Sequence, residues 1–381
     1  MVFYVIVALT VLNHIAFKGS KVLMSLYAIE LGANPFAIGL LFSLYSVFPL
    51  FMAFFVGRLS DRVGPRWPML LGTVGLAVGL LLPYFVPRLG ALYVSAAAIG
   101  AFYIFYTVSA QHLIGAFGGG AQRTRNFSIY SLGVGLTALL GPTITGFSID
   151  GIGHVATFLL LGLLPAGPAL YLFFAGKRLP HTVAVAPPGR QRAMDLVRNV
   201  PLRRMLITAG IIETGLELFS FYLPIYGHSI GLSASMIGII MGTFAAAMLI
   251  MRSVMPALVK RSSEEKVLFV SLSVAAGICV LFPFVSQVYL LLAISFVLGL
   301  GLGCCSPLSL IITYNRAPEG RSGEAMGMRQ TVTKFTEVMV PVVFGTLGAA
   351  FGIAPAFWFD AVLLSAGAWI MRADAKTRAS P

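Results

Sequence analysis

Long apolar runs recur along the chain, and each has about the length of a membrane-crossing helix. A helix needs roughly 20 mostly apolar residues to cross the ~30 Å hydrocarbon layer of a bilayer. Twelve runs satisfy this criterion, at residues 2–29, 37–56, 67–86, 91–115, 127–149, 154–175, 205–228, 235–255, 267–286, 288–313, 327–350 and 354–371. The pattern predicts an all-α membrane protein with 12 transmembrane helices.

The connections between the runs are short, with one exception. Residues 176–204, "GKRLPHTVAVAPPGRQRAMDLVRNVPLRR", form a basic, proline-containing segment after the sixth run. We therefore predict an N-terminal six-helix bundle at residues 1–175, a cytoplasmic linker at 176–204 and a C-terminal six-helix bundle at 205–381.

Composition agrees with a membrane protein, since 58% of the 381 residues are hydrophobic, only 10% are charged and the mean hydropathy is +0.92. The net charge of +13 could indicate nucleic-acid binding, but its distribution argues against that function. Every second connection between the runs, beginning with the one after the second run, is rich in Lys and Arg. Together with the C-terminus, these connections hold 21 of the 26 Lys and Arg residues, whereas the connections on the other side of the membrane hold only Arg88. Positively charged short loops stay in the cytoplasm. Both termini are therefore predicted to face the cytoplasm, in a multi-pass protein of the cytoplasmic (inner) membrane.

An internal repeat relates the two halves at a fixed offset of 199 residues, without a gap. The matching pairs are Tyr27 and Tyr226, Gly32 and Gly231, Ile38 and Ile237, Gly39 and Gly238, Pro142 and Pro341, Gly146 and Gly345, Gly153 and Gly352, and Phe158 and Phe357. Transporters are commonly built from such repeats, with the substrate near the bilayer midplane between them. The repeat predicts two parallel, pseudo-symmetric bundles.

The loop after the second run carries a glycine and charge pattern, "GRLSDRVGPR". Its spaced residues are Gly57, Asp61, Arg62, Gly64 and Arg66. The segment resembles the signature loop of the major facilitator superfamily, G-x-x-x-D-R/K-x-G-R-R/K, with Pro65 in place of the first closing basic residue. The resemblance implies a secondary transporter with the major facilitator fold, in which this loop acts as a cytoplasmic latch. At the offset of 199 the second half has the degenerate copy "PALVKR".

The fifth run, "GVGLTALLGPTITG", contains Gly141 and Pro142. It resembles the glycine-proline motif of the drug:proton antiporters, a 12-span group, and this implies export and a gating role for both residues. Small residues for packing alone are the alternative. The antiporters usually carry an arginine in the fourth span, whereas this chain has Gln111 and His112 near the cytoplasmic end of that run.

The first run contains three basic residues, His14, Lys18 and Lys21, within about 60° of one another on a helix. A charge near the bilayer centre costs about 2.5–3.5 kcal/mol, so this polar stripe is predicted to face a wet cavity. At the repeat offset of 199 residues, His14 corresponds to Glu213 and Lys18 corresponds to Glu217. These two glutamates are four residues apart and share a face of the seventh run. We expect the basic stripe to face this acidic one.

Two roles are open for these charges. In one, Glu213, Glu217 and Glu337 carry protons while His14, Lys18, Lys21, Arg252 and Lys334 bind an anionic substrate group. In the other, static ion pairs hold the halves together. Tyr106 of the fourth run is a further candidate substrate contact.

The sequence contains neither a phosphate-binding GxxxxGK[ST] loop nor an HExxH metal motif, and we predict no enzyme activity, no cofactor and no metal. The leading hypothesis is alternating-access export of a small organic solute, anionic or amphipathic, driven by protons. The alternatives are proton-coupled uptake or exchange of an organic anion, and a non-transporting receptor or scaffold. The predicted partners are the substrate, protons and the lipid bilayer, with a functional monomer.

Overall fold

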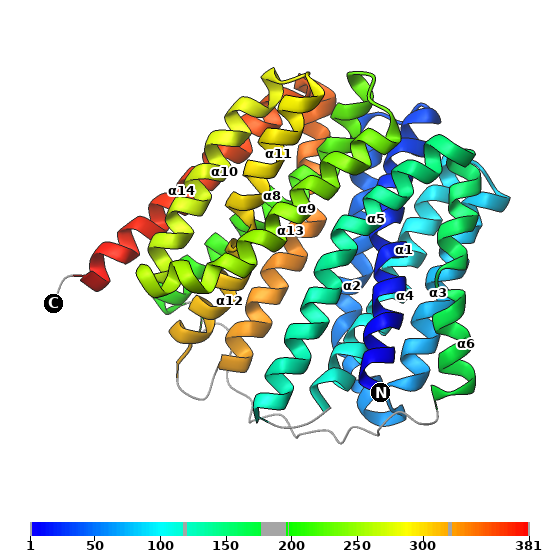
Figure 1. The fold of residues 1–381 in the computed structure, drawn as a ribbon, viewed down its shortest axis with the longest axis horizontal. Coiled ribbons are helices and arrows are strands. Elements are labelled where there is room, and N and C mark those ends of the chain that lie inside the picture. Colours follow the sequence, from blue (N-terminus) through cyan, green and yellow to red (C-terminus); the bar gives the residue numbers. More distant parts are fainter. Residues whose placement is uncertain (1, 117–119, 177–195, 197, 319–321, 380–381) are drawn as a thin grey trace. The chain divides into compact units, whose positions relative to one another are not determined.

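The computed structural model describes residues 2–116, 120–176, 196, 198–318 and 322–379, and every regular element in them is helical (Figure 1). The α-helices are α1 Val2–Glu30, α2 Pro35–Val63, α3 Arg66–Phe85, α4 Leu89–Ala116, α5 Gly120–Leu163, α6 Ala166–Phe174, α8 Val200–Ser229, α9 Ala234–Arg261, α10 Glu264–Leu281, α11 Val288–Gly303, α12 Cys305–Arg316, α13 Ser322–Phe351 and α14 Ile353–Ala379. A short 3₁₀ turn, η2, spans Phe282–Phe284.

Among the described residues, 11 helical segments are long and apolar enough to cross a membrane. One of them, Ile129–Phe174, has 46 residues and would measure roughly 70 Å if it were straight, more than twice a hydrocarbon layer. Gly153 interrupts its helical geometry with a φ of 81°. The all-helical membrane fold is thus confirmed, and the count of 12 crossings stays a prediction.

Local signals explain several helix boundaries. The Asn34 side chain accepts a hydrogen bond from the Ala37 amide at 2.9 Å and caps α2, whose first residue is proline. Ser263 caps α10 in the same way, and two glutamates occupy the first turn of that helix. Short polar loops therefore stop one apolar helix and start the next.

Turns at matching places in the two halves have the same backbone conformation. Gly32 and Gly231, which are 199 residues apart, have φ angles of 82° and 78°. Gly153 and Gly352, also 199 apart, have φ angles of 81° and 83°. Since side-chain-bearing residues rarely adopt positive φ, this agreement supports the internal repeat found in the sequence.

The chain divides into two compact units. Unit 1 comprises Met1–Pro187 and Gly227–Gly242, and unit 2 comprises Pro188–Tyr226 and Thr243–Pro381. The bundle boundaries predicted from the sequence differ from this division at the segment Gly227–Gly242 and stay a prediction. Most of the predicted linker lies outside the described residues.

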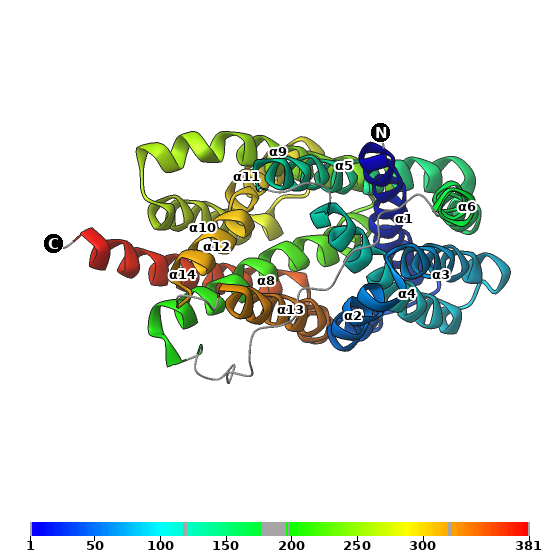
Figure 2. The ribbon, with the colours of Figure 1, turned by 90° about the horizontal axis from the view of Figure 1, so that it is seen from below.

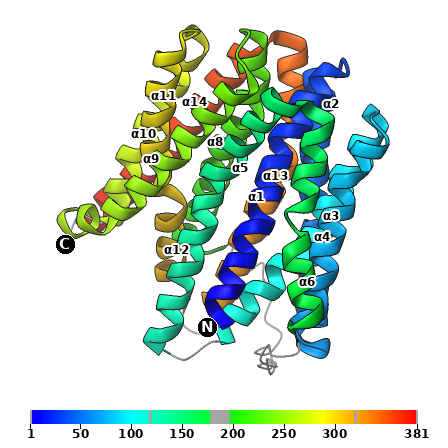
Figure 3. The ribbon, with the colours of Figure 1, turned by 45° about the vertical axis from the view of Figure 1, so that its right-hand side comes forward.

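In unit 1, α1 packs along α5, and α4 packs between α2 and α3. Figure 3 shows the first pairing, and Figure 2 shows α2, α3 and α4 beside one another. In unit 2, α10 packs mainly along α14 and α11. These pairings place the polar residues of α1 against α5.

Candidate functional site

The basic stripe of α1 lies mostly inside unit 1. His14 is 6% exposed and Lys21 is 8% exposed, while Lys18 is partly buried. The Nδ1 atom of His14 lies 3.0 Å from the carbonyl oxygen of Thr10, and its ring meets the Tyr103 ring edge-on with centroids 5.1 Å apart. The helix therefore carries these polar groups into the protein interior.

Aromatic rings contact two members of the stripe, His14 and Lys21. The Lys21 Nζ atom lies 5.5 Å from the centroid of the Phe42 ring, which suits a cation–π interaction. Phe17 stacks on Tyr103 with centroids 3.7 Å apart. Cationic groups beside flat rings can bind an amphipathic anion through its charge and its apolar part.

The glycine of the predicted gate packs directly against α1. A Cβ atom added to Gly141 would lie 2.9 Å from Lys18 Cβ and 3.1 Å from the Gly19 backbone nitrogen. Only a residue without a side chain permits this approach of α5 to α1. Next to it, the Pro142 carbonyl oxygen lies close to Gly238, where an added Cβ would approach it to 2.6 Å. The gating role of Gly141 and Pro142 stays a prediction.

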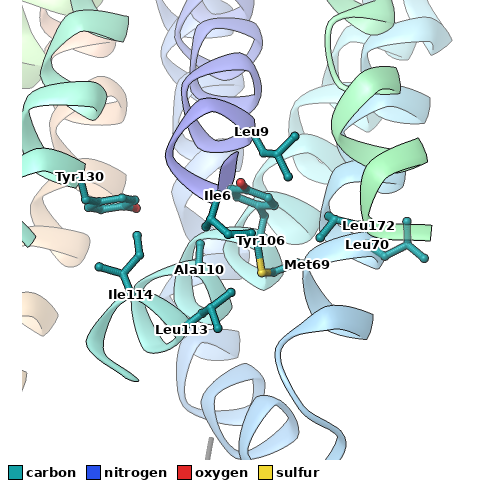
Figure 4. Close-up of a cluster of buried hydrophobic side chains, with 10 residues drawn as sticks. All are labelled: Ile6, Leu9, Met69, Leu70, Tyr106, Ala110, Leu113, Ile114, Tyr130 and Leu172. Carbon is teal, nitrogen blue, oxygen red and sulfur yellow. The ribbon is translucent and has the colours of Figure 1, made fainter. Parts of the chain in front are cut away.

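Tyr106 lies in a buried cluster rather than in an open cavity (Figure 4). Its side chain is fully buried and its hydroxyl lies 3.0 Å from the Thr10 hydroxyl. The apolar neighbours in the cluster include Ile6, Leu9, Met69 and Leu113. Tyr106 therefore joins α1, α3 and α4, and its contact with substrate stays a prediction.

The signature loop is described in part. Gly57, Asp61 and Arg62 lie in the last turns of α2, but their side chains are outside the described residues. Gly64 follows α2 with a φ of 79°, a conformation that requires glycine. The chain turns sharply there and enters α3.

Arg66, the last residue of the signature, connects α3 to the end of α6. Its Nε atom donates to the Leu172 carbonyl at 3.0 Å and its Nη2 atom donates to the Phe173 carbonyl at 2.5 Å. The guanidinium also lies 4.8 Å from the Trp67 ring centroid. Arg66 thus binds carbonyl groups that a helix leaves unpaired at its C-terminal end.

Unit 2 contains a cluster of acidic side chains around Lys334. The Nζ atom of this residue, on α13, lies 2.5 Å from Glu337 Oε1. It also interacts electrostatically with Glu213 and Glu217 of α8. Glu217 is 8% exposed, and the Lys334 and Glu337 side chains are 35% and 15% exposed. We call these four residues the acidic cluster.

Arg329 of α13 is a further buried base and approaches the same cluster. It is 7% exposed, donates to the Ser309 hydroxyl at 3.0 Å and is attracted by Glu213. Arg252, the other predicted ligand from this half, donates to the Gly303 carbonyl at 3.2 Å. Lys334 therefore lies with all three glutamates that were predicted to carry protons, whereas Arg252 binds a backbone carbonyl.

Sequence reasoning missed a buried ionic network at the ends of four helices of unit 2. Arg316, only 3% exposed, lies 2.6 Å from Asp374 and 3.3 Å from Glu265 and donates to the Pro201 carbonyl at 3.0 Å. Arg204 adds a second bond to Asp374 at 2.8 Å. We call Arg204, Glu265, Arg316 and Asp374 the Arg316 network; it joins α8, α10, α12 and α14.

Asp360 is completely buried on α14. Its Oδ2 atom accepts from the Cys279 thiol at 3.6 Å, and its Oδ1 atom lacks a hydrogen-bond partner among the described residues. Asp150 has a different role, because its carboxylate accepts hydrogen bonds from the Ala234 and Ser235 amides at 3.1 and 2.8 Å and caps α9.

The described residues contain no group of three His, Cys, Asp or Glu side chains able to hold a metal.

Comparison with known proteins agrees with this geometry. The sequence profile of the Major Facilitator Superfamily matches residues 6–286 and 205–381. A multidrug resistance protein MdtG of Proteus mirabilis is 25% identical over 353 residues, covering 90% of this chain and 87% of its own. The MdtG of Dickeya zeae is 23% identical and covers 91% and 87%. An uncharacterised MFS-type transporter of Methanocaldococcus jannaschii is 22% identical and covers 89% of both chains.

Solved structures share the fold at low sequence identity. A POT family transporter in complex with 5-aminolevulinic acid has a TM-score of 0.81 at 16% identity, with 98% of this chain and 96% of the other covered. The nucleoside transporter NupG has a TM-score of 0.78 at 14% identity, with 97% of each chain covered. The predicted membership is confirmed, and the predicted absence of enzyme activity agrees with a family of transporters. The chain belongs to the Major Facilitator Superfamily and is a multi-pass membrane transporter.

Proposed function

We propose that this transporter exports an amphipathic organic solute in exchange for protons, by alternating access. The observation that carries the proposal is the acidic cluster, in which Lys334 is shared among Glu213, Glu217 and Glu337 within membrane-spanning helices. Ionisable groups at membrane depth are costly and mark ion and proton pathways.

Sharing one ammonium among several carboxylates suits proton exchange. When one glutamate takes up a proton, it loses its charge and most of its attraction for Lys334. The ammonium group then moves toward the remaining carboxylates, because the side chain of lysine is long and flexible. Protonation of the cluster therefore changes how α8 and α13 are held together, and release of the proton restores the first arrangement.

The substrate class follows from α1. The His14 ring meets the Tyr103 ring of the Phe17–Tyr103 stack, and the Lys21 ammonium lies over the Phe42 ring. An organic molecule with a flat apolar part and an anionic group fits such surroundings. The multidrug resistance names of the MdtG relatives support a drug-like amphipathic solute and the outward direction. The glycine-proline motif at Gly141 and Pro142 favours the same direction.

We further propose the predicted topology: 12 crossings in two six-helix bundles, both termini in the cytoplasm and a functional monomer in the cytoplasmic membrane. As the internal repeat predicts, this proposal includes Lys18 facing Glu217. The cytoplasmic latch at Asp61 and Arg62 belongs to it as well.

Proteoliposomes with an internal pH indicator test the function. Fluorescent amphipathic dyes, one anionic, one neutral and one cationic, are loaded inside, and an inward proton gradient is imposed. We expect dye to leave the vesicles faster with the gradient, accompanied by proton influx, and the anionic dye to leave fastest. Dye movement at the same rate with and without the gradient would exclude proton coupling.

Uptake or exchange of an organic anion is the second candidate, and it is favoured by the buried bases His14, Lys21 and Arg329. The same vesicles separate the two candidates. An exchanger accelerates efflux of an anionic dye when unlabelled anion is added outside, whatever the proton gradient. A symporter accumulates external anion together with protons, whereas an exporter does neither.

A further inference from the structure

Two grooves flank α10 in unit 2. The larger groove, about 600 Å³, lies between α9 and α10. Its lining includes apolar side chains such as Leu258 and Val267 and three basic residues, Arg261, Lys266 and Arg372. Arg261 and Lys266 come from the end of α9 and the start of α10, so the basic residues gather at one end of these helices.

The smaller groove, about 280 Å³, runs between α10 and α14 and meets the larger one, since Phe269 and Arg372 line both. Its remaining lining is mostly small or apolar and includes Gly277, Val280 and Trp369. The Arg372 guanidinium lies 5.9 Å from the Phe269 ring centroid. A positive charge is therefore fixed at the point where the two grooves join.

The surroundings of the grooves are those of a lipid-covered surface. Val270 is 56% exposed, Val362 is 66% exposed and Trp369 is 70% exposed, on the same two helices that form the smaller groove. In a transporter that spans the bilayer, exposed apolar side chains of this size on membrane-crossing helices contact acyl chains. The occupant of the grooves is for this reason a membrane component rather than a water-soluble molecule.

We propose that these grooves bind one anionic two-chain phospholipid. Its phosphate lies among Arg261, Lys266 and Arg372, and one acyl chain lies in each groove, on either side of Phe269. Charge complementarity supports this occupant, because basic pockets between membrane helices bind anionic headgroups and each Lys or Arg near the surface contributes about fivefold to affinity. The site is separate from the acidic cluster and does not depend on the proposed transport activity.

Native mass spectrometry of the purified full-length protein tests the headgroup. The protein is released from nanodiscs containing equal amounts of phosphatidylglycerol and phosphatidylcholine, which differ in headgroup charge. We expect one retained phosphatidylglycerol per chain. In the triple variant Arg261→Gln, Lys266→Gln, Arg372→Gln, retention should fall on the order of 100-fold. Lys260→Gln, an exposed neighbour that does not line the grooves, is the matched control and should retain the lipid.

A second variant tests the acyl-chain groove. Gly277 lines the smaller groove and a Cβ atom added to it meets nothing within 4 Å, so Gly277→Leu places its side chain in the space of that groove. We expect this variant to lose phosphatidylglycerol but to keep its one-chain lyso form, which needs only the larger groove. Gly90→Leu, at another glycine with open space around it, is the control and should keep both lipids.

Three retention results would overturn the proposal. In the first, the wild type and the triple variant retain equal amounts of phosphatidylglycerol. In the second, the wild type retains phosphatidylcholine and phosphatidylglycerol equally. In the third, Lys260→Gln loses as much lipid as the triple variant. Displacement of bound lipid by millimolar inorganic phosphate would also contradict it, because a phosphate without acyl chains gains nothing from the grooves. Melting curves in phosphatidylcholine alone check that every variant is folded.

Discussion

The Arg316 guanidinium lies 2.6 Å from the Asp374 carboxylate, with both side chains buried at the ends of α12 and α14. The same guanidinium reaches Glu265 at 3.3 Å and the Pro201 carbonyl at 3.0 Å. One side chain therefore joins the ends of four helices, and its removal takes from Asp374 the shorter of its two arginine bonds and from Glu265 its bond to Arg316.

Arg316→Gln is expected to destabilise the protein by about 3–5 kcal/mol, because breaking a buried pair from one side leaves uncompensated charge. Arg204→Gln is the matched control: that side chain is 46% exposed, and its bond to Asp374 should contribute no more than about 1 kcal/mol. Thermal or denaturant unfolding in detergent measures both. Equal losses of unfolding free energy in the two variants would show that Arg316 contributes no more to stability than the exposed Arg204.

Two aspartates of α14 should respond oppositely to the same substitution. Asp360→Asn removes a buried carboxyl that pairs with no basic side chain among the described residues, and we expect stability to be unchanged or to rise by about 1 kcal/mol. Asp374→Asn should cost several kcal/mol, since two arginines bind that carboxylate. Melting temperatures of the two variants give the comparison. A larger loss of stability from Asp360→Asn than from Asp374→Asn would contradict this expectation.

Proton coupling should depend on the acidic cluster. Glu217→Gln keeps the size of the side chain and one acceptor oxygen but cannot exchange a proton. We expect gradient-driven dye efflux from proteoliposomes to fall at least tenfold, whereas exchange of dye across the membrane without a gradient persists. Glu264→Gln, at a partly exposed position in the first turn of α10, is the control and should leave both rates unchanged. Loss of exchange together with driven efflux would instead indicate a structural role for Glu217.

The contact between α1 and α5 should reject even one methyl group. Gly141→Ala places a Cβ atom 2.9 Å from Lys18 Cβ, so the helices must separate, at a cost of about 1–3 kcal/mol. Gly151→Ala, in the same helix, meets nothing within 4 Å and should be neutral or slightly stabilising. Unfolding measurements on both variants test this difference in sign. Transport by the Gly141→Ala protein then reports whether close packing also matters for gating.

Labelling tests the proposed orientation. In a protein whose three buried cysteines, Cys279, Cys304 and Cys305, are replaced by alanine, Lys260→Cys should react with a membrane-impermeant maleimide only from the cytoplasmic side. Arg88→Cys should react only from the opposite side. Right-side-out and inside-out vesicles distinguish these outcomes. Labelling of both positions from one side would contradict the orientation derived from the loop charges.

The sequence predicted the helices well because membrane crossing imposes a strong hydropathy pattern. Three bases on one face of an apolar helix must avoid lipid, and His14 and Lys21 are buried, whereas the wet cavity predicted for this stripe stays a prediction. The Arg316 network was not predictable, because residues 204, 265, 316 and 374 share no spacing and each resembled an ordinary helix-end charge. Only the packing of four helix ends brings them together.

The internal repeat has one informative exception. Arg66 and Glu265 stand 199 residues apart, yet they carry opposite charges. Arg66 holds its half through backbone carbonyls, which do not ionise, whereas Glu265 holds its half through Arg316. The first fastening therefore uses neutral backbone acceptors, whereas the second uses a buried ion pair. Equivalent positions of a duplicated chain thus secure their helix ends by different chemistry, so a substitution at one position does not predict the effect of a substitution at its counterpart.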